Sequence, residues 1–242
     1  MVNEVTLSLY LVGHHGNWND FTNGKRDIVR DTRLTQRVAF EKGIPITLFF
    51  SGVELEEMAN HKDDIHSELW FDAIGGIQGD YFINPRYGIN DPFKPELGIM
   101  TFNHNPLVQP RFEEHQAEYL EGVLPDQLQR SIDVAVYKFN KRPVTIHPPD
   151  GVYALMAAYK LRQHGIDTVV VSGEFLGGNR HAKGVLYLAS GLRHLMRTND
   201  LQPQDSRFQK AEHFIDAVRT YGHENDIGQI VVGCDIDEFN GM

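Results

Sequence analysis

The chain has 242 residues, of which 41% are hydrophobic and 23% charged, and its formal net charge is −10. This length and composition are typical of one sizeable globular domain and exclude a disordered or fibrous protein. The negative charge argues against unaided binding to nucleic acid or to an anionic membrane, because both need a basic surface that neutralises phosphates.

No apolar run approaches the roughly 20 residues that span a bilayer. The N-terminal sequence has no basic segment followed by a small-residue cleavage site, so we expect no signal peptide. The single cysteine, Cys234, leaves no internal disulfide and fits a reducing compartment. A cytoplasmic protein is therefore predicted.

Seven short apolar runs alternate with helical patterns along the chain. They are VTLSLYLV (5–12), PITLFF (45–50), IMTF (99–102), PVTI (143–146), TVVV (168–171), VLYLA (185–189) and QIVV (229–232). Because the runs are nearly continuously apolar, they indicate parallel strands buried on both faces. The alternation favours an α/β fold of right-handed βαβ units, either a closed or nearly closed barrel or an open doubly wound sheet.

The helical patterns have identifiable ends. One begins near Thr32. A second begins at Pro125 and carries an apolar stripe of Leu128, Ile132 and Ala135, a third spans 152–164 and ends at Gly165, and a fourth begins at Ser206, whose spacing to Gln209 suits a capping box. Apart from these elements, residues 76–98 are rich in Gly, Pro and Asn and are predicted to form a long loop, often a lid or binding loop in compact domains. No linker or repeat interrupts the chain, so residues 1–242 are interpreted as a single domain.

Polar side chains directly follow almost every predicted strand. In barrels and open α/β sheets, ligands bind at the carboxyl ends of the strands. The residues at these ends are His14, His15, Asn17, Trp18, Ser51, Asn103, His104, Asn105, His147, Asp150, Ser172, Glu174, Asp235, Asp237 and Glu238. Packing alone does not require His, Asp or Glu at so many strand ends, so the sequence predicts a ligand site on this edge.

Some of these residues also have a structural interpretation. Asp150 stands two residues before Val152, where it would cap a helix, and capping is the usual role of Asp at such a position. The pair His14–His15 lies between glycines in a predicted loop, and Asp235 could be an ordinary turn residue. The structural and the functional role of Asp150 do not exclude each other.

Two reaction types suit these residues. Asp150 and Asp235, from strands far apart in sequence, could act as the two carboxylates of glycosidic chemistry. Alternatively, His14 or His15, His104 and Asp235 could bind zinc or a similar ion for metal-assisted hydrolysis. The sequence has no HExxH motif, no Gly-rich phosphate loop and no GxSxG elbow, which lowers the case for nucleotide enzymes and serine hydrolases.

Five segments together resemble the catalytic domain of glycoside hydrolase family 57, within the polysaccharide-deacetylase-like superfamily. They are GHHGNW, MTFNHNPLVQ, VTIHPPDGVYALMAAYKLRQHGIDTVVVSGE, LRHLMRTNDLQ and VVGCDIDEFNG. The resemblance covers almost the whole chain. It departs from the family at Asp150, where the family has a nucleophilic Glu, and at Ile236-Asp237, which replace Gly-Glu. The deacetylase branch fits less well, because it needs an Asp-Asp pair after the first strand.

The resemblance implies an incomplete (β/α)7 barrel that cleaves or transfers α-glucosidic bonds with retention, without a metal or organic cofactor. Asp150 would then be the nucleophile and Asp235 the acid/base. Contacts with an oligosaccharide or polysaccharide are expected from His14, His15, Asn17, Trp18, His104, His147 and Asp237. The alternatives are a metal-dependent carbohydrate or amide hydrolase and a non-catalytic sugar-binding protein.

Overall fold

The structure is a computed structural model, and part of the chain can be described in it. The described residues are 5–12, 46–60, 96–104, 107, 113–151, 154–172, 184–187, 191–198, 201, 207 and 211–235. The predicted helix near Thr32, most of the predicted loop 76–98 and the predicted cap at Ser206 lie outside these residues.

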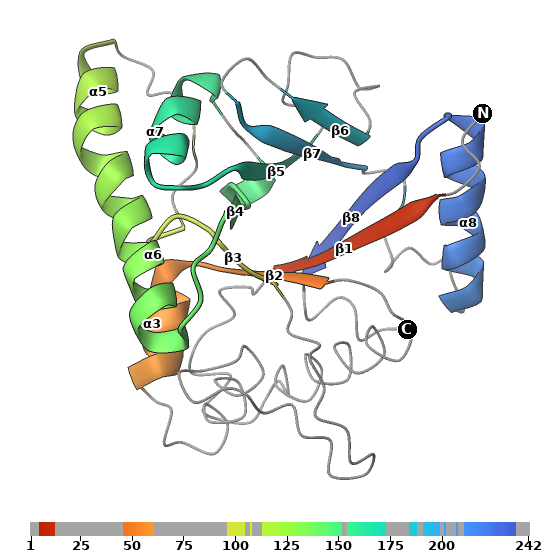
Figure 1. Cartoon of the computed structure of the whole chain (residues 1–242), viewed down its shortest axis with the longest axis horizontal. Coiled ribbons are helices and arrows are strands. Elements are labelled where there is room, and N and C mark those ends of the chain that lie inside the picture. Colours follow the sequence, from red (N-terminus) through yellow and green to blue (C-terminus); the bar gives the residue numbers. More distant parts are fainter. Residues whose placement is uncertain are drawn as a thin grey trace.

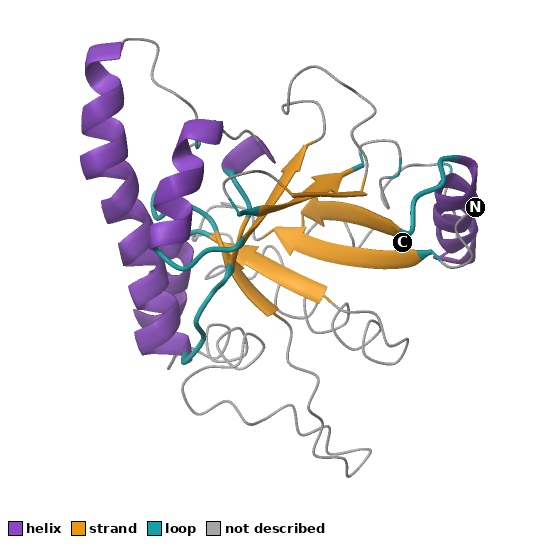
Figure 2. Ribbon diagram, turned by 45° about the horizontal axis from the view of Figure 1, so that its top comes forward, coloured by secondary structure: helices purple, strands orange, loops and turns teal. Residues whose placement is uncertain are grey.

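Eight described strands form one curled sheet in the order β5-β4-β3-β2-β1-β8-β7-β6, with an additional pairing between β5 and β7. The strands are β1 (Thr6–Val12), β2 (Ile46–Phe50), β3 (Glu96–Ile99), β4 (Thr145–Ile146), β5 (Thr168–Ser172), β6 (Gly184–Tyr187), β7 (Arg193–Arg197) and β8 (Gln229–Asp235). All neighbouring pairs are parallel except β6–β7. This arrangement confirms the incomplete (β/α)7 barrel, and Figure 2 shows its strands between described helices on either side.

Two strand predictions need correction. The run at 185–189 was predicted as a barrel strand, but β6 is antiparallel to β7 and lies beside the barrel ring. The seventh parallel strand is instead β7, which the sequence analysis missed because only Leu195 and Met196 of the five residues Arg193–Arg197 are apolar. In addition, β3 begins at Glu96, inside the predicted loop, and ends at Ile99, so the predicted strand 99–102 mostly lies beyond its end.

Glu96 explains why β3 was placed too late. An exposed acidic residue does not suggest a strand, but its carboxylate accepts hydrogen bonds from Thr47 Oγ1 on β2, at 3.2 Å, and from Thr145 Oγ1 on β4. These bonds lie at the amino-terminal end of the barrel. At the same end, Arg193 Nη2 on β7 donates to Thr168 Oγ1 on β5, at 2.8 Å. Polar pairs of this kind join adjacent strands where the barrel interior meets water.

The described helices are α3 (Gly52–Asn60), α5 (Glu113–Glu118), α6 (Leu124–Phe139), α7 (Ala158–Gln163) and α8 (Ala211–Glu224), with a π turn, η1 (Tyr119–Val123), between α5 and α6. Pro125 lacks the N–H of a regular helical bond, and the wider π turn before it accommodates this gap. In Figure 1, α3, α6 and α7 cover one side of the sheet, while α8 lies beside β8. No described helix is long and apolar enough to cross a membrane.

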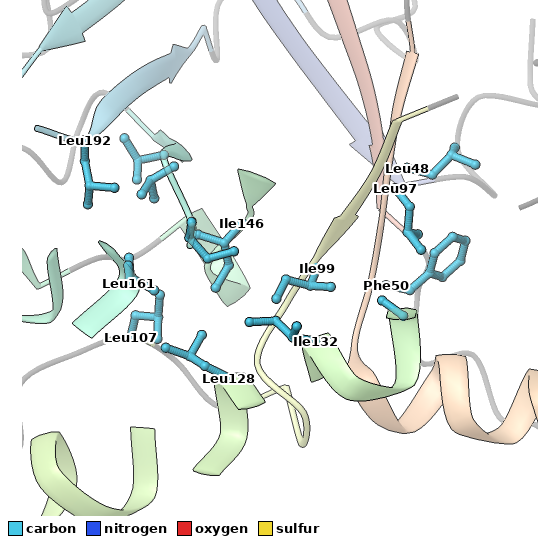
Figure 3. Close-up of a cluster of buried hydrophobic side chains, with 14 of the residues drawn as sticks. Leu48, Phe50, Leu97, Ile99, Leu107, Leu128, Ile132, Ile146, Leu161 and Leu192 are labelled. Atoms are coloured by element: carbon cyan, nitrogen blue, oxygen red, sulfur yellow. The ribbon is translucent and has the colours of Figure 1, made fainter. Parts of the chain in front are cut away.

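The main core lies between the strands and these helices. Leu128, Ile132 and Ala135 of α6 are buried, which confirms the predicted stripe after Pro125. Figure 3 shows Leu128 and Ile132 close to Ile99 and Ile146 from the outer face of the sheet. The side chains that alternate with these on the strands face the barrel interior and form a second, smaller cluster.

The predicted helix 152–164 is shorter than expected. Two 3₁₀ turns, η2 (Pro149–Gly151) and η3 (Leu155–Ala157), precede α7, whose N-cap residue is Ala157. Asp150 therefore does not cap this helix. The predicted end is confirmed, because Gly165 follows α7 with a φ of 81°, which a residue with a Cβ rarely adopts.

Candidate active site

Three rings fill the barrel interior where β1, β2 and β4 approach the carboxyl edge of the sheet. Tyr10, Phe49 and His147 are all buried, and their ring centroids lie 5.2–5.6 Å apart. Tyr10 Oη also lies 3.3 Å from Nε2 of His147, so a hydrogen bond links β1 to the end of β4 across the interior. We call these three residues the aromatic floor, because they close the barrel below its carboxyl edge.

The floor requires glycine on the neighbouring strand. Tyr10 of β1 stands in register with Gly233 of β8. A Cβ atom at Gly233 would lie 1.9 Å from Cζ of Tyr10, and a Cβ at Gly98 of β3 would lie 2.2 Å from Cε1 of Phe49. Real Cβ atoms do not come this close, so both rings occupy space that only glycine leaves open. Gly98 and Gly233 thus determine where the floor lies.

His147 is uncharged at neutral pH. Burial, together with the nearby positive charges of Arg197 and His104, lowers its pKa to about 3. Its Nδ1 is buried and has no hydrogen-bond partner in the part of the chain that the structure describes. The inward-facing residue at the end of β4 is therefore a neutral imidazole with one unsatisfied nitrogen.

The loop after β3 holds His104 in an unusual conformation. His104 has a φ of 57°, in the left-handed region that non-glycine residues rarely occupy, and its N–H donates to Thr101 O at 3.0 Å. Two neighbours tie the loop down: Asn103 N–H donates to Oε1 of Gln127 at 2.8 Å, and the guanidinium of Arg130 lies 3.8 Å from the centre of the Phe102 ring. Conformations of this kind cost about 1–3 kcal/mol and cluster at functional sites.

A capping box at the start of α3 supports the same loop. Ser51 N–H and Oγ donate to Oε2 of Glu54 at 2.8 and 2.9 Å, and Val53 N–H donates to Phe102 O at 3.0 Å. Burial raises the pKa of Glu54 to about 7, although the hydrogen bonds from Ser51 oppose this shift. Gly52 allows the close packing, because a Cβ there would lie 2.3 Å from Phe102.

The backbone of Asp150 is fixed at the carboxyl end of β4. It lies in the turn η2, which is closed by Gly151 N–H donating to Pro148 O at 2.8 Å. Gly151 has a φ of 67°, and a Cβ there would lie 3.0 Å from the backbone nitrogen of Ser172, so the turn packs directly on the end of β5. The side chain of Asp150 lies outside the described residues.

Asp235 is the last residue of β8 and stands in register with Val12, two residues after the Tyr10–Gly233 pair. Its side chain also lies outside the described residues. Asp150 follows His147 by three positions, and Asp235 follows Gly233 by two. Because His147 and Gly233 both contact Tyr10, both aspartates lie a few residues beyond the same floor.

The other predicted site residues divide into two groups. His104 and His147 are both placed at the carboxyl edge, close enough for the charge of His104 to affect the pKa of His147. Ser51, Asn103 and Ser172 also belong to the described residues. The remaining predictions lie outside them: His14, His15, Asn17, Trp18, Asn105, Glu174, Asp237 and Glu238. Among the described residues alone, no three His, Cys, Asp or Glu side chains come together as metal ligands.

The sequence analysis missed Tyr10 and Arg197. Tyr10 lies inside a correctly predicted strand. Its inward orientation follows from its register with Gly233 on β8, which leaves room for the ring, and this register is not visible in the local sequence. Arg197 ends β7, in register with Ser172 of β5 and Val231 of β8. Because β7 was not predicted as a strand, its carboxyl end was not searched for site residues.

Comparison with known proteins adds information on the fold. No protein-family model matches the chain, and no curated protein sequence does either. Among solved structures, a 4-α-glucanotransferase from Thermococcus litoralis superposes with a TM-score of 0.63 at 15% identity over 98% of this chain. The α-amylase AmyC from Thermotoga maritima gives 0.57 at 12% identity over 97%, and a candidate polysaccharide deacetylase from Mycobacterium smegmatis gives 0.56 at 13% over 97%.

These matches span 34% of the glucanotransferase, 68% of the amylase and 78% of the deacetylase. The chain thus corresponds to about a third of the length of the first protein. At such low identity the likeness shows a shared barrel fold and nothing finer. Solved structures with this barrel do include proteins named as enzymes that act on carbohydrates.

Proposed function

We propose that the chain is a carbohydrate-active enzyme that cleaves or transfers α-glucosidic bonds by a retaining, two-carboxylate mechanism. The observation that supports this most directly is the placement of Asp150 and Asp235. One is fixed in the turn after β4 and the other ends β8, and the strands that carry them are joined through Tyr10. The barrel likeness to a glucanotransferase and an α-amylase agrees with the proposal.

In the first step, the Asp150 carboxylate attacks the anomeric carbon and forms a glycosyl ester. Asp235, protonated, donates its proton to the glycosidic oxygen as that bond breaks. In the second step, the Asp235 carboxylate takes a proton from water or from a sugar hydroxyl. The oxygen of that acceptor attacks the anomeric carbon and releases Asp150. Water gives hydrolysis, and a sugar gives transfer.

The aromatic floor would exclude water and charge from below the reacting bond. All three rings are buried and His147 is neutral, so the floor adds no counter-ion that would compete with the two carboxylates. The proposal gives the sugar contacts to His104 and His147, and to His14, His15, Asn17, Trp18 and Asp237 outside the described residues. Trp18 would supply a flat apolar face for a sugar ring.

One observation favours a second candidate, a sugar-binding protein without turnover. The inward-facing residue directly after β4 is His147, a neutral imidazole, and the nearest following carboxylate is three positions further along. A displacement of about 1 Å can reduce a rate around 100-fold. If Asp150 does not reach the anomeric carbon, the site would retain sugar binding and lose chemistry.

The test is turnover of maltotetraose by the wild-type chain and by Asp235→Asn and Asp150→Asn. Both variants should lose at least about 10²–10³-fold in kcat, since each removes one of the two reacting carboxylates. The matched control is Asp216→Asn, an exposed carboxylate on α8 that should keep full activity. Full activity in Asp235→Asn would refute the assignment, and binding without turnover in the wild type would favour the second candidate.

A chelator experiment separates the proposed mechanism from metal-assisted hydrolysis. Activity on maltotetraose should survive extended dialysis against EDTA, because neither proposed step uses a metal ion. Loss of activity that zinc restores would contradict the two-carboxylate mechanism and favour a metal-dependent hydrolase.

A further inference from the structure

Nδ1 of His147 is a buried polar atom that no described residue satisfies. The His147 residue is 4% exposed, and no described group accepts or donates a hydrogen bond at this nitrogen. An unsatisfied buried donor or acceptor costs about 1–3 kcal/mol, and native structures keep few of them. At the ligand edge of a barrel, such an atom can form a hydrogen bond with a bound molecule.

Tyr10 decides which of the two ring nitrogens carries the proton. Its Oη lies 3.3 Å from Nε2. A phenol is a better donor than acceptor, because its oxygen lone pair is delocalised into the ring, and the unprotonated nitrogen of a neutral imidazole is a good acceptor. The favourable arrangement has Tyr10 donating to Nε2, which places the proton of the neutral ring on Nδ1.

The packing prevents His147 from escaping this arrangement. Tyr10 and Phe49 contact the imidazole at centroid distances of 5.2 and 5.6 Å, and Gly233 confines Tyr10 from the side of β8. The His147 N–H donates to Ile99 O at 3.0 Å, so its backbone is tied to β3 as well. Ring position and proton position are therefore set together, before a ligand arrives.

We propose that Tyr10 is a positioning residue that fixes His147 as its Nδ1–H tautomer, and that Nδ1–H donates to a hydroxyl oxygen of a neutral sugar. This inference rests on the proposed function and identifies one atom of its binding site. A neutral donor recognises an uncharged hydroxyl without requiring an anionic group on the ligand. Satisfying Nδ1 on binding also recovers the cost of leaving it unpaired in the free protein.

Two substitutions at His147 separate its nitrogens. The amide of His147→Gln reaches the position of Nε2 and can keep the contact with Tyr10, but it leaves nothing at Nδ1. The amide of His147→Asn keeps a polar group near Nδ1 and loses the contact with Tyr10. Tyr10→Phe removes only the hydroxyl group. The matched control is Ser131→Ala, which removes another buried atom without a described partner, on α6 and outside the aromatic floor.

The measurements are ¹⁵N NMR of the His147 ring and calorimetric titration with maltotetraose. We expect a protonated Nδ1 in the wild type, whose signal shifts when maltotetraose is added, and a mixture of tautomers in Tyr10→Phe. Affinity should fall about 10-fold in Tyr10→Phe and at least as much in His147→Gln, about the effect of one hydrogen bond. His147→Asn should lose less than His147→Gln, and Ser131→Ala should bind like the wild type.

The inference would be overturned by an Nε2–H tautomer in the wild type, or by unchanged affinity in both Tyr10→Phe and His147→Gln. Sugar binding by the wild type would in that case still support the proposed function. Absence of maltotetraose binding in the wild type would instead overturn the proposed function, and the inference with it. The tautomer of the free protein is a readout that a merely structural role for Tyr10 would not predict.

Discussion

Glu54 should make the stability of the protein depend on pH in a direction opposite to that of most carboxylates. Burial raises its pKa from 4.5 to about 7, so the folded state holds the proton more tightly than the unfolded state does. The favourable contribution of the protonated form is fully present below about pH 4.5. It is lost as the pH rises through about 7. Replacing Glu54 with Gln removes this dependence.

The magnitude follows from the shift. Each pKa unit corresponds to about 1.4 kcal/mol, so the shift from 4.5 to about 7 gives an upper bound of about 3–4 kcal/mol. Because the accessible surface of Glu54 shows it to be only half-buried, water screens part of this free energy, and we expect a stability difference of about 1–3 kcal/mol. The Gln oxygen can still accept from Ser51, whose N–H lies 2.8 Å from the carboxylate. The capping box is thus kept while the buried charge is removed.

The assay is urea unfolding of the wild type and Glu54→Gln at pH 4.5, 6 and 8. The two proteins should be equally stable at pH 4.5, and the variant should be more stable by about 1–3 kcal/mol at pH 8. Glu118→Gln, an exposed carboxylate on α5, is the control and should show no comparable difference. A Glu54→Gln variant that is clearly less stable than the wild type at pH 8 would refute the reasoning, because ionised Glu54 would then be stabilising.

Three further predictions concern the floor and its support. Gly233→Ala forces a Cβ to within 1.9 Å of Tyr10, so thermal unfolding should show a loss of stability of about 3 kcal/mol or more, and sugar binding should be lost as well. Gly122→Ala, whose Cβ would meet no atom within 4 Å, should cost no stability, and equal stability of the two variants would contradict the packing. As the pH falls from 6.5 to 4.5, the wild type should lose about 2–3 kcal/mol more stability than His147→Gln, because the wild-type His147 pKa of about 3 lies below that of the unfolded chain. Parallel curves of stability against pH would argue against a buried neutral ring. Ser51→Ala should cost about 1 kcal/mol through the lost cap, and an unchanged urea midpoint would show that the cap is not needed.

The fold was predictable from the sequence where hydrophobic pattern and burial agree. Strands such as Thr168–Ser172 are buried along their whole length and give a continuous apolar run. The strand Arg193–Arg197 was missed because only two of its five residues are apolar, and the described part of the apolar run at 185–189 belongs to the antiparallel strand β6. Register and direction depend on contacts between distant segments, which a local pattern does not contain.

The site was predictable in part for a similar reason. The rule that ligands bind at the carboxyl ends of parallel strands led to His104 and His147, which the structure places at that edge. The rule examines only residues that follow strands, so Tyr10, inside a strand, escaped it. Its role depends on Gly233, more than 200 residues away, and the packing of the two appears only when β1 and β8 pair.

The central claim is that Asp150 and Asp235 act as a pair on one sugar. The most direct measurement is the distance between their carboxyl groups in a crystal structure of the chain soaked with maltotetraose. The retaining mechanism predicts about 5–5.5 Å, with the scissile bond between the two groups. A separation of about 6.5–9.5 Å would indicate inversion, and an Asp150 that points away from the bound sugar would contradict the two-carboxylate account altogether.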